Sequence, residues 1–302
     1  MPIRNLIKKT LKSKGPLNIL SFFYDGKFDI ELLTTGHNFY GFKGHSAYQW
    51  QNYKTDYSNL HLLDQPLYHL NSFDFAVINQ RDRQRQFLNI CQSLHLPVLL
   101  IDHDFSRDNA YQRHQKKLPF DSVSTNKFVQ KQFDNELINY AINQNEGQYL
   151  KDIDVLMCGN FSQNDFGLIQ QIKTHIPNSK IIGNNLPFSE EISTYEDYKA
   201  LFPRAKVYIN LASQENIPYE LLWAQRYNCF TISNEIPPYE LLKESNLFKV
   251  VSSLEEIINL TKMYINKPQI KTTLDLSQHN DVTFQEQWNK KFEQFRNRIY
   301  TI

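Results

Sequence analysis

Short apolar runs alternate with amphipathic segments along most of this chain. Runs such as 17–23 and 98–101 are uniformly apolar, which is typical of buried strands. Between them, apolar residues recur at helical spacing, as in 84–94. This alternation predicts mainly parallel sheets with helices on both faces. The strands that we expect are 17–23, 37–42, 61–63, 75–78, 98–101, 122–125, 153–158, 180–182, 206–211 and 229–233.

The alternation stops at a polar stretch, 143–151, and then begins again. We therefore predict an α/β protein with two doubly wound Rossmann-like domains facing each other across a cleft. The first domain covers residues 1–145 and the second covers residues 151–280. Overlapping Ser-x-x-Glu capping boxes at Ser252 and Ser253 predict a helix that runs to about residue 265.

A C-terminal helix is predicted over 281–302. Thr283-x-x-Glu286 reads as the capping box that opens it. Its apolar residues share one face, so the helix needs a partner surface to cover them. These residues are Phe284, Trp288, Phe292, Phe295 and Ile299.

Composition narrows the class of protein. The chain has 302 residues, of which 41% are hydrophobic and 22% charged, as in globular proteins. A net charge of +1 argues against a general nucleic-acid binder. The cysteines, Cys91, Cys158 and Cys229, form no C-x-x-C motif, which indicates a reducing compartment and a cytoplasmic location.

Three features of the sequence concern contact with membranes. No apolar run reaches the roughly 18 residues that a membrane helix needs. The N-terminal segment lacks the apolar region of a secretory signal. Residues 3–14 are basic, with apolar residues at helical spacing. This segment is either a peripheral contact with an anionic membrane, on its inner surface, or a solvated helix.

The richest chemistry lies between residues 205 and 235. A polar loop, 212–217, follows the strand 206–211 and precedes a helix that starts at Pro218. Proline suits the first helical position, and Glu220 in the first turn suits the helix dipole. Ligands of open α/β sheets, phosphates above all, bind at such helix starts beyond the carboxyl ends of strands.

This segment resembles the sugar-nucleotide segment of GT-B glycosyltransferases, most closely that of family 4 (glycosyl transferases group 1). The resemblance rests on 213–218 (SQENIP), the apolar helix after it, and 228–233 (NCFTIS). It implies a GT-B fold whose C-terminal helix packs back on the first domain. It also implies that the donor contacts this segment, through Ser213, Asn216, Ile217 and Pro218.

The family carries two glutamates eight positions apart. Glu215 occupies the first position and by resemblance contacts the hydroxyls of the donor sugar. The second position holds Trp223, so the carboxylate that binds the ribose is missing there. Glu220 lies one turn earlier, in reach of the same region. The alternatives are that Glu220 only caps its helix and that Trp223 only packs.

Two further motifs match the family by position. His103-Asp104 follows the strand 98–101, where family 4 enzymes carry a His-Asp pair near the donor sugar. Gly159-Asn160 corresponds to the glycine loop that opens the second domain. The basic residues that usually follow this loop are replaced by Ser162, Gln163, Asn164 and Asp165.

The strand end at 102–104 has other interpretations. Asp102-x-Asp104 also fits the metal-binding DxD motif of GT-A glycosyltransferases, because paired carboxylates hold a divalent ion on a diphosphate. A polar strand end with hydrogen-bonded caps is the third interpretation. No histidine pairs with cysteine or aspartate at zinc-ligand spacing, so we expect no bound metal.

The acceptor side is expected on the first domain. His45 and Tyr48 lie in an aromatic loop, 41–53, and Asp25 lies in a turn after the first strand. A histidine beside a cleft acts as a base or forms a hydrogen bond with the backbone, and both interpretations stand for His45.

The expected function is transfer of a sugar from a nucleotide-sugar to an unidentified acceptor: a glycan, a lipid-linked acceptor or a nucleic acid. The resemblance implies a retaining, metal-independent hexosyltransferase without a resident cofactor, with a UDP- or GDP-sugar favoured as donor. One alternative is a degenerate GT-B module that binds a sugar or nucleotide without turnover. The other is a metal-dependent, GT-A-like enzyme.

Overall fold

The structure is a computed structural model of the whole chain. It describes residues 15–22, 26–42, 57–63, 73–79, 84–102, 119–125, 135–138, 149–159, 161–183, 186–192, 194–211, 219–234 and 240–300. The described residues form two compact units. The first contains the described residues up to 138 together with 279–300, and the second contains 149–278.

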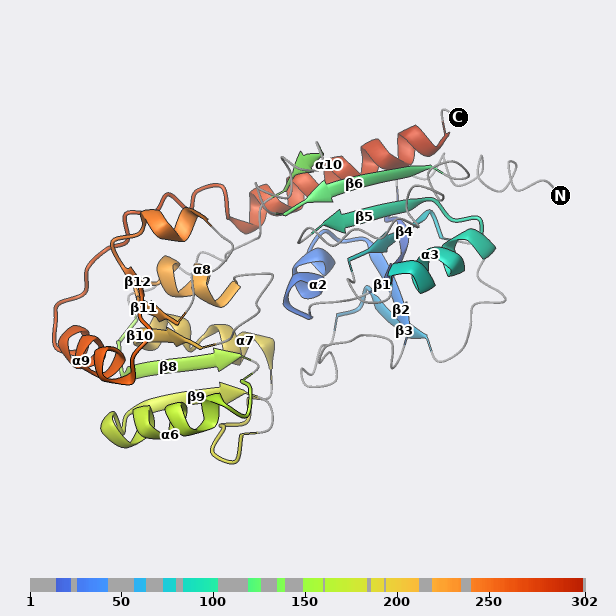
Figure 1. Cartoon of the computed structure of the whole chain (residues 1–302). Helices are drawn as coiled ribbons and strands as arrows, with labels where there is room; N and C mark the ends of the chain where they lie inside the picture. Colours follow the sequence, from blue (N-terminus) through green and yellow to red (C-terminus); the bar gives the residue numbers. More distant parts are fainter. Residues whose placement is uncertain are drawn as a thin grey trace. The chain divides into compact units, whose positions relative to one another are not determined.

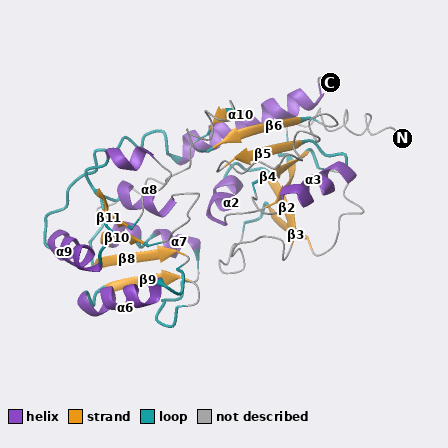
Figure 2. Ribbon diagram, in the orientation of Figure 1, coloured by secondary structure: helices purple, strands orange, loops and turns teal. Residues whose placement is uncertain are grey.

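The first unit is built on a seven-stranded sheet whose neighbouring strands are all parallel (Figures 1 and 2). The strand order is β3-β2-β1-β4-β5-β6-β7, so β1 and β4 flank the point where the order reverses. The strands are β1 (Asn18–Phe22), β2 (Asn38–Phe42), β3 (Leu60–Leu63), β4 (Phe75–Ile78), β5 (Val98–Asp102), β6 (Phe120–Ser124) and β7 (Glu136–Leu137).

Helices cover both faces of this sheet. Helix α3 (Gln84–Ser93) packs its apolar stripe, including Phe87 and Cys91, on Leu20, Ala76 and Leu100. Helix α2 (Gly26–Leu33) contacts helix α10 (Asp281–Tyr300) through the rings of Phe28 and Trp288, 5.9 Å apart. The sequence pattern predicted α3 and missed α2. The polar residues Lys27, Asp29 and Glu31 alternate with apolar residues at a period of two, so the sequence of α2 shows no helical period.

The C-terminal helix, α10, packs on the first unit, as predicted. Its apolar face contacts the sheet: the ring of Phe292 lies 5.8 Å from that of Phe75, and the ring of Phe295 lies 5.1 Å from it. Lys291, 7% exposed, reaches Asp121 at 3.0 Å and Glu136 at 3.2 Å on the edge strands β6 and β7. Figure 1 shows α10 running beside β6.

The capping box predicted at Thr283 is wrong. Helix α10 begins at Asp281, the first residue of the predicted range, and Thr283 lies inside it. The side chain of Asn280 accepts a hydrogen bond from the backbone N–H of Thr283 at 2.8 Å, so Asn280 caps the helix. The cap predicted at Ser253 is confirmed, because its hydroxyl accepts from the N–H of Glu256 at 3.2 Å.

The second unit is built on a five-stranded parallel sheet in the order β12-β11-β10-β8-β9. Helices α6 and α9 share a core on one face, where Ile169 and Ile257 pack with Val207 and Ile232. Helices α7 and α8 lie on the other. The elements are β8 (Ile153–Gly159), α6 (Asp165–His175), β9 (Ser179–Gly183), α7 (Tyr195–Lys199), η2 (Phe202–Arg204), β10 (Ala205–Asn210), α8 (Tyr219–Arg226), β11 (Phe230–Ser233), η3 (Glu240–Glu244), β12 (Phe248–Val250) and α9 (Leu254–Ile265).

The fold class is therefore confirmed: two parallel α/β sheets with flanking helices and a returning C-terminal helix. Among the described residues, no helix is both long and apolar enough to cross a membrane. The three cysteines are buried and form no disulfide. Burial raises the pKa of the Cys91 and Cys229 thiols, which keeps both protonated.

Within the first unit, His37 connects the residue before β1 with helix α10. Its Nδ1 accepts a hydrogen bond from the backbone N–H of Leu17 at 3.2 Å, and its ring lies 5.5 Å from that of Phe292. Burial lowers the pKa of His37, and the positive charge of Arg296 lowers it further. Hydrogen bonding with Asn289 and the charge of Glu293 raise this pKa but do not reverse the shift.

We predict that this histidine makes the protein less stable in acid. Because the folded-state pKa is below the unfolded value of about 6.5, the unfolded chain binds the proton first as pH falls. The stabilisation is complete above that value and is lost as pH falls toward and through the folded-state pKa. Urea unfolding between about pH 7.5 and pH 5 measures it.

His37→Gln should flatten this part of the pH dependence of the unfolding free energy. A profile that is equally steep in native protein and His37→Gln would show that other groups cause the acid sensitivity.

Candidate functional site

The second sheet has its topological switch point between β8 and β10. From β8 the chain first adds β9 on one side, then β10 and β11 on the other. The connections leaving β8 and β10 therefore lead to opposite sides of this point. Ligands of doubly wound sheets bind in this place. The strands end there at Gly159 and Asn210.

The turn after β8 is built around two glycines. Gly159 has a φ of 138°, a conformation that side chains rarely allow. Gly183, at the end of β9, lies under the ring of Phe161. A Cβ added at Gly183 would stand 2.6 Å from Cδ2 of Phe161 and 2.8 Å from the carbonyl oxygen of Gly159. The two glycines let the turn close tightly over the neighbouring strand.

Helix α8 begins at Tyr219, after the connection that follows β10. It packs against β10 and β11 and returns the chain to the start of β11, so its N-terminus lies toward the carboxyl edge of the sheet. The N–H groups of a helix's first turn have no intrahelical partners and carry partial positive charge. This end of α8 is therefore suited to an anion.

Glu220 is fully buried in the first turn of α8. Its Oε1 accepts a hydrogen bond from the hydroxyl of Tyr198 on α7 at 2.7 Å. This bond ties α8 to α7 and fixes the direction of the carboxylate. The side chain is thus part of the interior of the second unit, and a contact with a ribose stays a prediction.

Trp223 is 1% exposed and lies in an aromatic cluster on the same side of α8. The centroid of its ring is 5.2 Å from that of Phe202, 5.6 Å from that of Tyr219 and 5.9 Å from that of Tyr195. Lys199 Nζ stands 5.9 Å from the ring centroid. The structure therefore shows Trp223 packed, in line with the alternative interpretation from the sequence. A ligand contact for it also stays a prediction.

The sequence analysis did not single out two polar residues that lie at this edge. Asn210 ends β10 and Ser233 ends β11, and both are buried at adjacent strand ends. The amide nitrogen of Asn210 lies 3.5 Å from the hydroxyl oxygen of Ser233. The sequence contains a pattern that could have identified them: each is a polar residue that ends an apolar strand of a parallel sheet.

The carboxyl edge of the first sheet also collects buried polar groups. The amide of Asn79, after β4, donates to the carboxylate of Asp29 on α2. Asp102, at the end of β5, accepts from the amide of Asn135 at 3.1 Å. Asn135 also accepts from the hydroxyl of Ser124 at 2.6 Å. Of these residues, the sequence analysis singled out Asp102 and missed the others.

The GT-A interpretation of Asp102-x-Asp104 is corrected as far as it concerns the fold. A second complete α/β unit with its own five-stranded sheet has no counterpart in that interpretation. Asp102 is buried with its carboxylate bonded to Asn135. In the described part of the chain, no three His, Cys, Asp or Glu residues are grouped to hold a metal ion.

Most residues proposed from the sequence lie outside the described residues, so the structure neither brings them together nor separates them. Gly159, Glu220 and Trp223 are the described ones. The others are Asp25, His45, Tyr48, His103, Asp104, Asn160, Ser213, Glu215, Asn216, Ile217 and Pro218.

Comparisons with known proteins bear on the fold. No protein-family model and no curated protein sequence matches this chain. Among solved structures, it is similar to UDP-N-acetylglucosamine 2-epimerase from Rickettsia bellii, with a TM-score of 0.61 and 8% identity over 94% of this chain and 98% of that one. Anabaena Alr3699/HepE, in complex with UDP-glucose, gives a TM-score of 0.63 and 12% identity over 92% and 100%.

WaaG, a glycosyltransferase involved in lipopolysaccharide biosynthesis, gives a TM-score of 0.50 and 10% identity over 83% of this chain and 91% of that one. At such low identities these likenesses concern the fold alone. They confirm the GT-B architecture that the sequence predicted.

We predict that Gly183→Ala disturbs the turn at Gly159. The new methyl group would overlap the ring of Phe161 and the carbonyl of Gly159, so one of them must move. Overpacking of this kind costs about 1–3 kcal/mol of unfolding free energy, which urea denaturation measures. Gly167→Ala on α6 is the matched control, because nothing lies within 4 Å of its added Cβ. Equal stabilities of the two variants would contradict the tight closure of this turn.

Proposed function

We propose that this chain transfers a sugar from a nucleotide-sugar, with a UDP- or GDP-sugar favoured, to an acceptor. The observation that carries the proposal is the carboxyl edge of the second sheet. There, the glycine turn at Gly159 and the start of α8 follow the two strands of the switch point. The Anabaena protein of the same fold in complex with UDP-glucose supports a nucleotide-sugar as the donor.

In this proposal the donor diphosphate lies at the N-terminus of α8, and the Gly159–Asn160 turn approaches the nucleotide. The N–H groups at the start of the helix and the helix dipole stabilise the leaving diphosphate without a metal ion. Glu215 orients the donor sugar, with Ser213, Asn216, Ile217 and Pro218 completing the loop. By the sequence resemblance, His103 and Asp104 also act on the donor sugar. The acceptor enters beside His45, Tyr48 and Asp25, and the anomeric configuration is retained.

A second candidate function is binding of a nucleotide-sugar without turnover. The burial of Trp223 favours it, because the position that the resemblance gives to a ribose-binding carboxylate is taken by a packed ring. Glu220 is the nearest carboxylate on α8, and Tyr198 holds it in the interior. The two candidates agree on a donor site and differ in the chemistry that follows.

We predict that a UDP- or GDP-sugar raises the unfolding temperature of the full chain. A ligand that binds only the folded state adds about 2.7 kcal/mol at one hundred times its Kd. A thermal-shift screen with UDP-, GDP-, ADP- and CMP-sugars measures the effect, and EDTA should not abolish it. If no nucleotide-sugar shifts the transition, both candidate functions fail. If EDTA abolishes the shift and Mn²⁺ restores it, the metal-independent site is wrong.

Glu215→Gln tests turnover, because it keeps the size of the side chain and removes its charge. Hydrogen bonds to charged groups are worth about 1.5–3 kcal/mol, so the transfer rate should fall about tenfold or more. The free energy of unfolding should stay within about 0.5 kcal/mol of the native value. Glu191→Gln, at an exposed position of the same unit, is the control and should leave both unchanged.

Mass spectrometry of the products distinguishes the possible reactions. Donor binding without any transfer or hydrolysis in the native protein supports the second candidate instead of the first. Epimerised donor would indicate the reaction named for the Rickettsia bellii protein. Loss of stability in Glu215→Gln with intact donor binding would show a structural role for Glu215.

A further inference from the structure

A cavity of about 110 Å³ lies at the amino edge of the second sheet, the edge opposite the candidate functional site. It lies between the starts of β10 and β11 and the turn that follows α9. Its cationic wall consists of Lys151, Lys206 and Lys267. Phe230 and Tyr264, whose rings stack 3.4 Å apart, are also among its lining residues.

Two of the three lysines of this wall form no ion pair with the described residues. Lys151 donates to two backbone carbonyls, of Ala205 at 2.5 Å and of Tyr227 at 2.7 Å, so its charge remains. Lys267 stands 4.6 Å from the ring centroid of Tyr264 and, among the described residues, forms no ion pair. Lys206 is the lysine of the wall that meets a carboxylate, of Asp154 at 2.6 Å.

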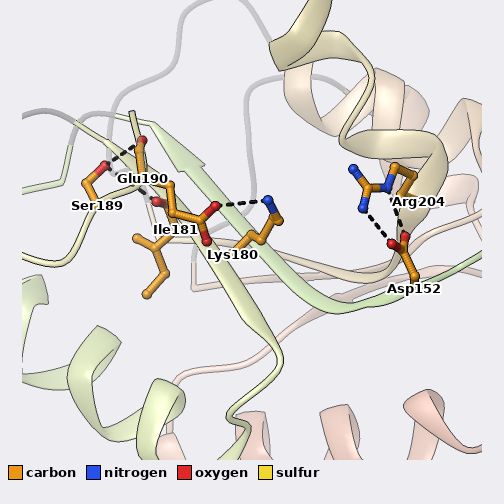
Figure 3. Close-up of polar contacts among 6 residues, drawn as sticks. All are labelled: Asp152, Lys180, Ile181, Ser189, Glu190 and Arg204. Atoms are coloured by element: carbon orange, nitrogen blue, oxygen red, sulfur yellow. Dashed lines mark hydrogen bonds and ion pairs between the residues drawn. The ribbon is translucent and has the colours of Figure 1, made fainter. Parts of the chain in front are cut away.

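Asp152, which lies just before β8, forms an ion pair with Arg204. The Nε of Arg204 donates to its Oδ1 at 2.9 Å, and this bond holds the pKa of Asp152 below its usual range (Figure 3). The carbonyl end of α9 contributes roughly half a negative charge at most. The ammonium groups of Lys151 and Lys267 carry two whole positive charges, which outweigh this partial negative charge. The cavity therefore favours an anion.

An apolar rim borders this cationic cavity. Leu150 is 81% exposed, Ile270 42% and Tyr149 38%. Ile270 is itself a lining residue of the cavity, and Tyr149 and Leu150 directly precede Lys151 of the cationic wall. The ring of Tyr149 packs against that of Tyr227 at 6.0 Å, and the Tyr227 carbonyl accepts from both Lys151 and Gln269. A free anion in the cavity would leave Leu150 and Ile270 in water. The headgroup region of a membrane would cover them while supplying the anion.

We propose that this amino-edge face, made of the cationic wall and the apolar rim, docks on an anionic membrane, with a phospholipid phosphate in the cavity. Lysines near an anionic leaflet attract it electrostatically, and the apolar rim enters the interface between headgroups and acyl chains. The surface is distinct from the N-terminal segment considered above and does not depend on the proposed sugar transfer. It would hold the second unit by the edge remote from its candidate donor site.

Co-sedimentation of the full chain with vesicles tests the proposal. The vesicles contain phosphatidylcholine alone or with about one third phosphatidylglycerol. The native protein should bind the anionic vesicles and bind neutral ones weakly, with a steep loss of binding as salt increases. Loss of one lysine is worth about fivefold in the partition coefficient. Leu150→Ser/Lys267→Gln should therefore lower it about tenfold, because the exposed leucine is lost as well.

The matched control is Val282→Ser/Lys290→Gln, which removes one exposed apolar and one exposed basic side chain from α10. All variants keep the N-terminal segment, so its contribution cancels in the comparison. Circular dichroism and urea unfolding verify that both double variants fold. Binding lost in the first double variant and kept in the second supports the proposal.

Equal binding by native protein and both double variants would overturn the proposal, as would absence of native binding to anionic vesicles. A third outcome is that inorganic phosphate or glycerol phosphate raises the unfolding temperature of native protein but not of Leu150→Ser/Lys267→Gln, without vesicle binding. The cavity then takes a soluble anion, and the membrane proposal is wrong.

Discussion

The burial of helix α8 is the constraint on which the second unit depends. Its residues from Tyr219 to Gln225 are all buried, so almost every side chain has a partner inside the unit. Tyr198 holds Glu220 near its start, and Thr231 accepts a hydrogen bond from Gln225 near its end at 2.9 Å. A helix fixed at both ends presents its first N–H groups in one position. Preorganised dipoles of this kind bind and stabilise charge without reorganising.

The first unit depends on a segment from the far end of the chain. Helix α10 covers the rings of Phe28, Phe39 and Phe75, which would otherwise meet water on that face of the sheet. Lys291 adds a charge that is buried only because Asp121 and Glu136 surround it. Aromatic burial supplies the attraction and the ion pairs fix the register, since a displaced helix would leave a charge unpaired.

The two edges of the second sheet have different chemistry. At the carboxyl edge lie Gly159, the polar residues Asn210 and Ser233 and the start of α8, whose dipole supplies partial positive charge. At the amino edge, whole lysine charges surround a cavity, and the nearby carboxylates are occupied by Arg204 and Lys206. The carboxyl edge and the amino edge of a parallel sheet lie at opposite ends of its strands, so the length of the strands separates them. One unit therefore has room for a chemical site and a docking surface that do not interfere.

The sequence by itself determined the alternation of strands and helices, the apolar face of α10 and the cap at Ser253, because each depends on residues close together along the chain. It also predicted the GT-B architecture, while Glu215, His103 and Asp104 remain predictions from resemblance. Only the tertiary structure decided that Glu220 meets Tyr198, that Phe161 covers Gly183 and that Lys151 meets Tyr227. These partners come from separate elements, so no local period or spacing encodes their contact. Helix α2 and the Asn280 cap were missed because local patterns there are ambiguous: the polar residues of α2 alternate with a period of two, and Asn280 and Thr283 are both suitable cap residues three positions apart.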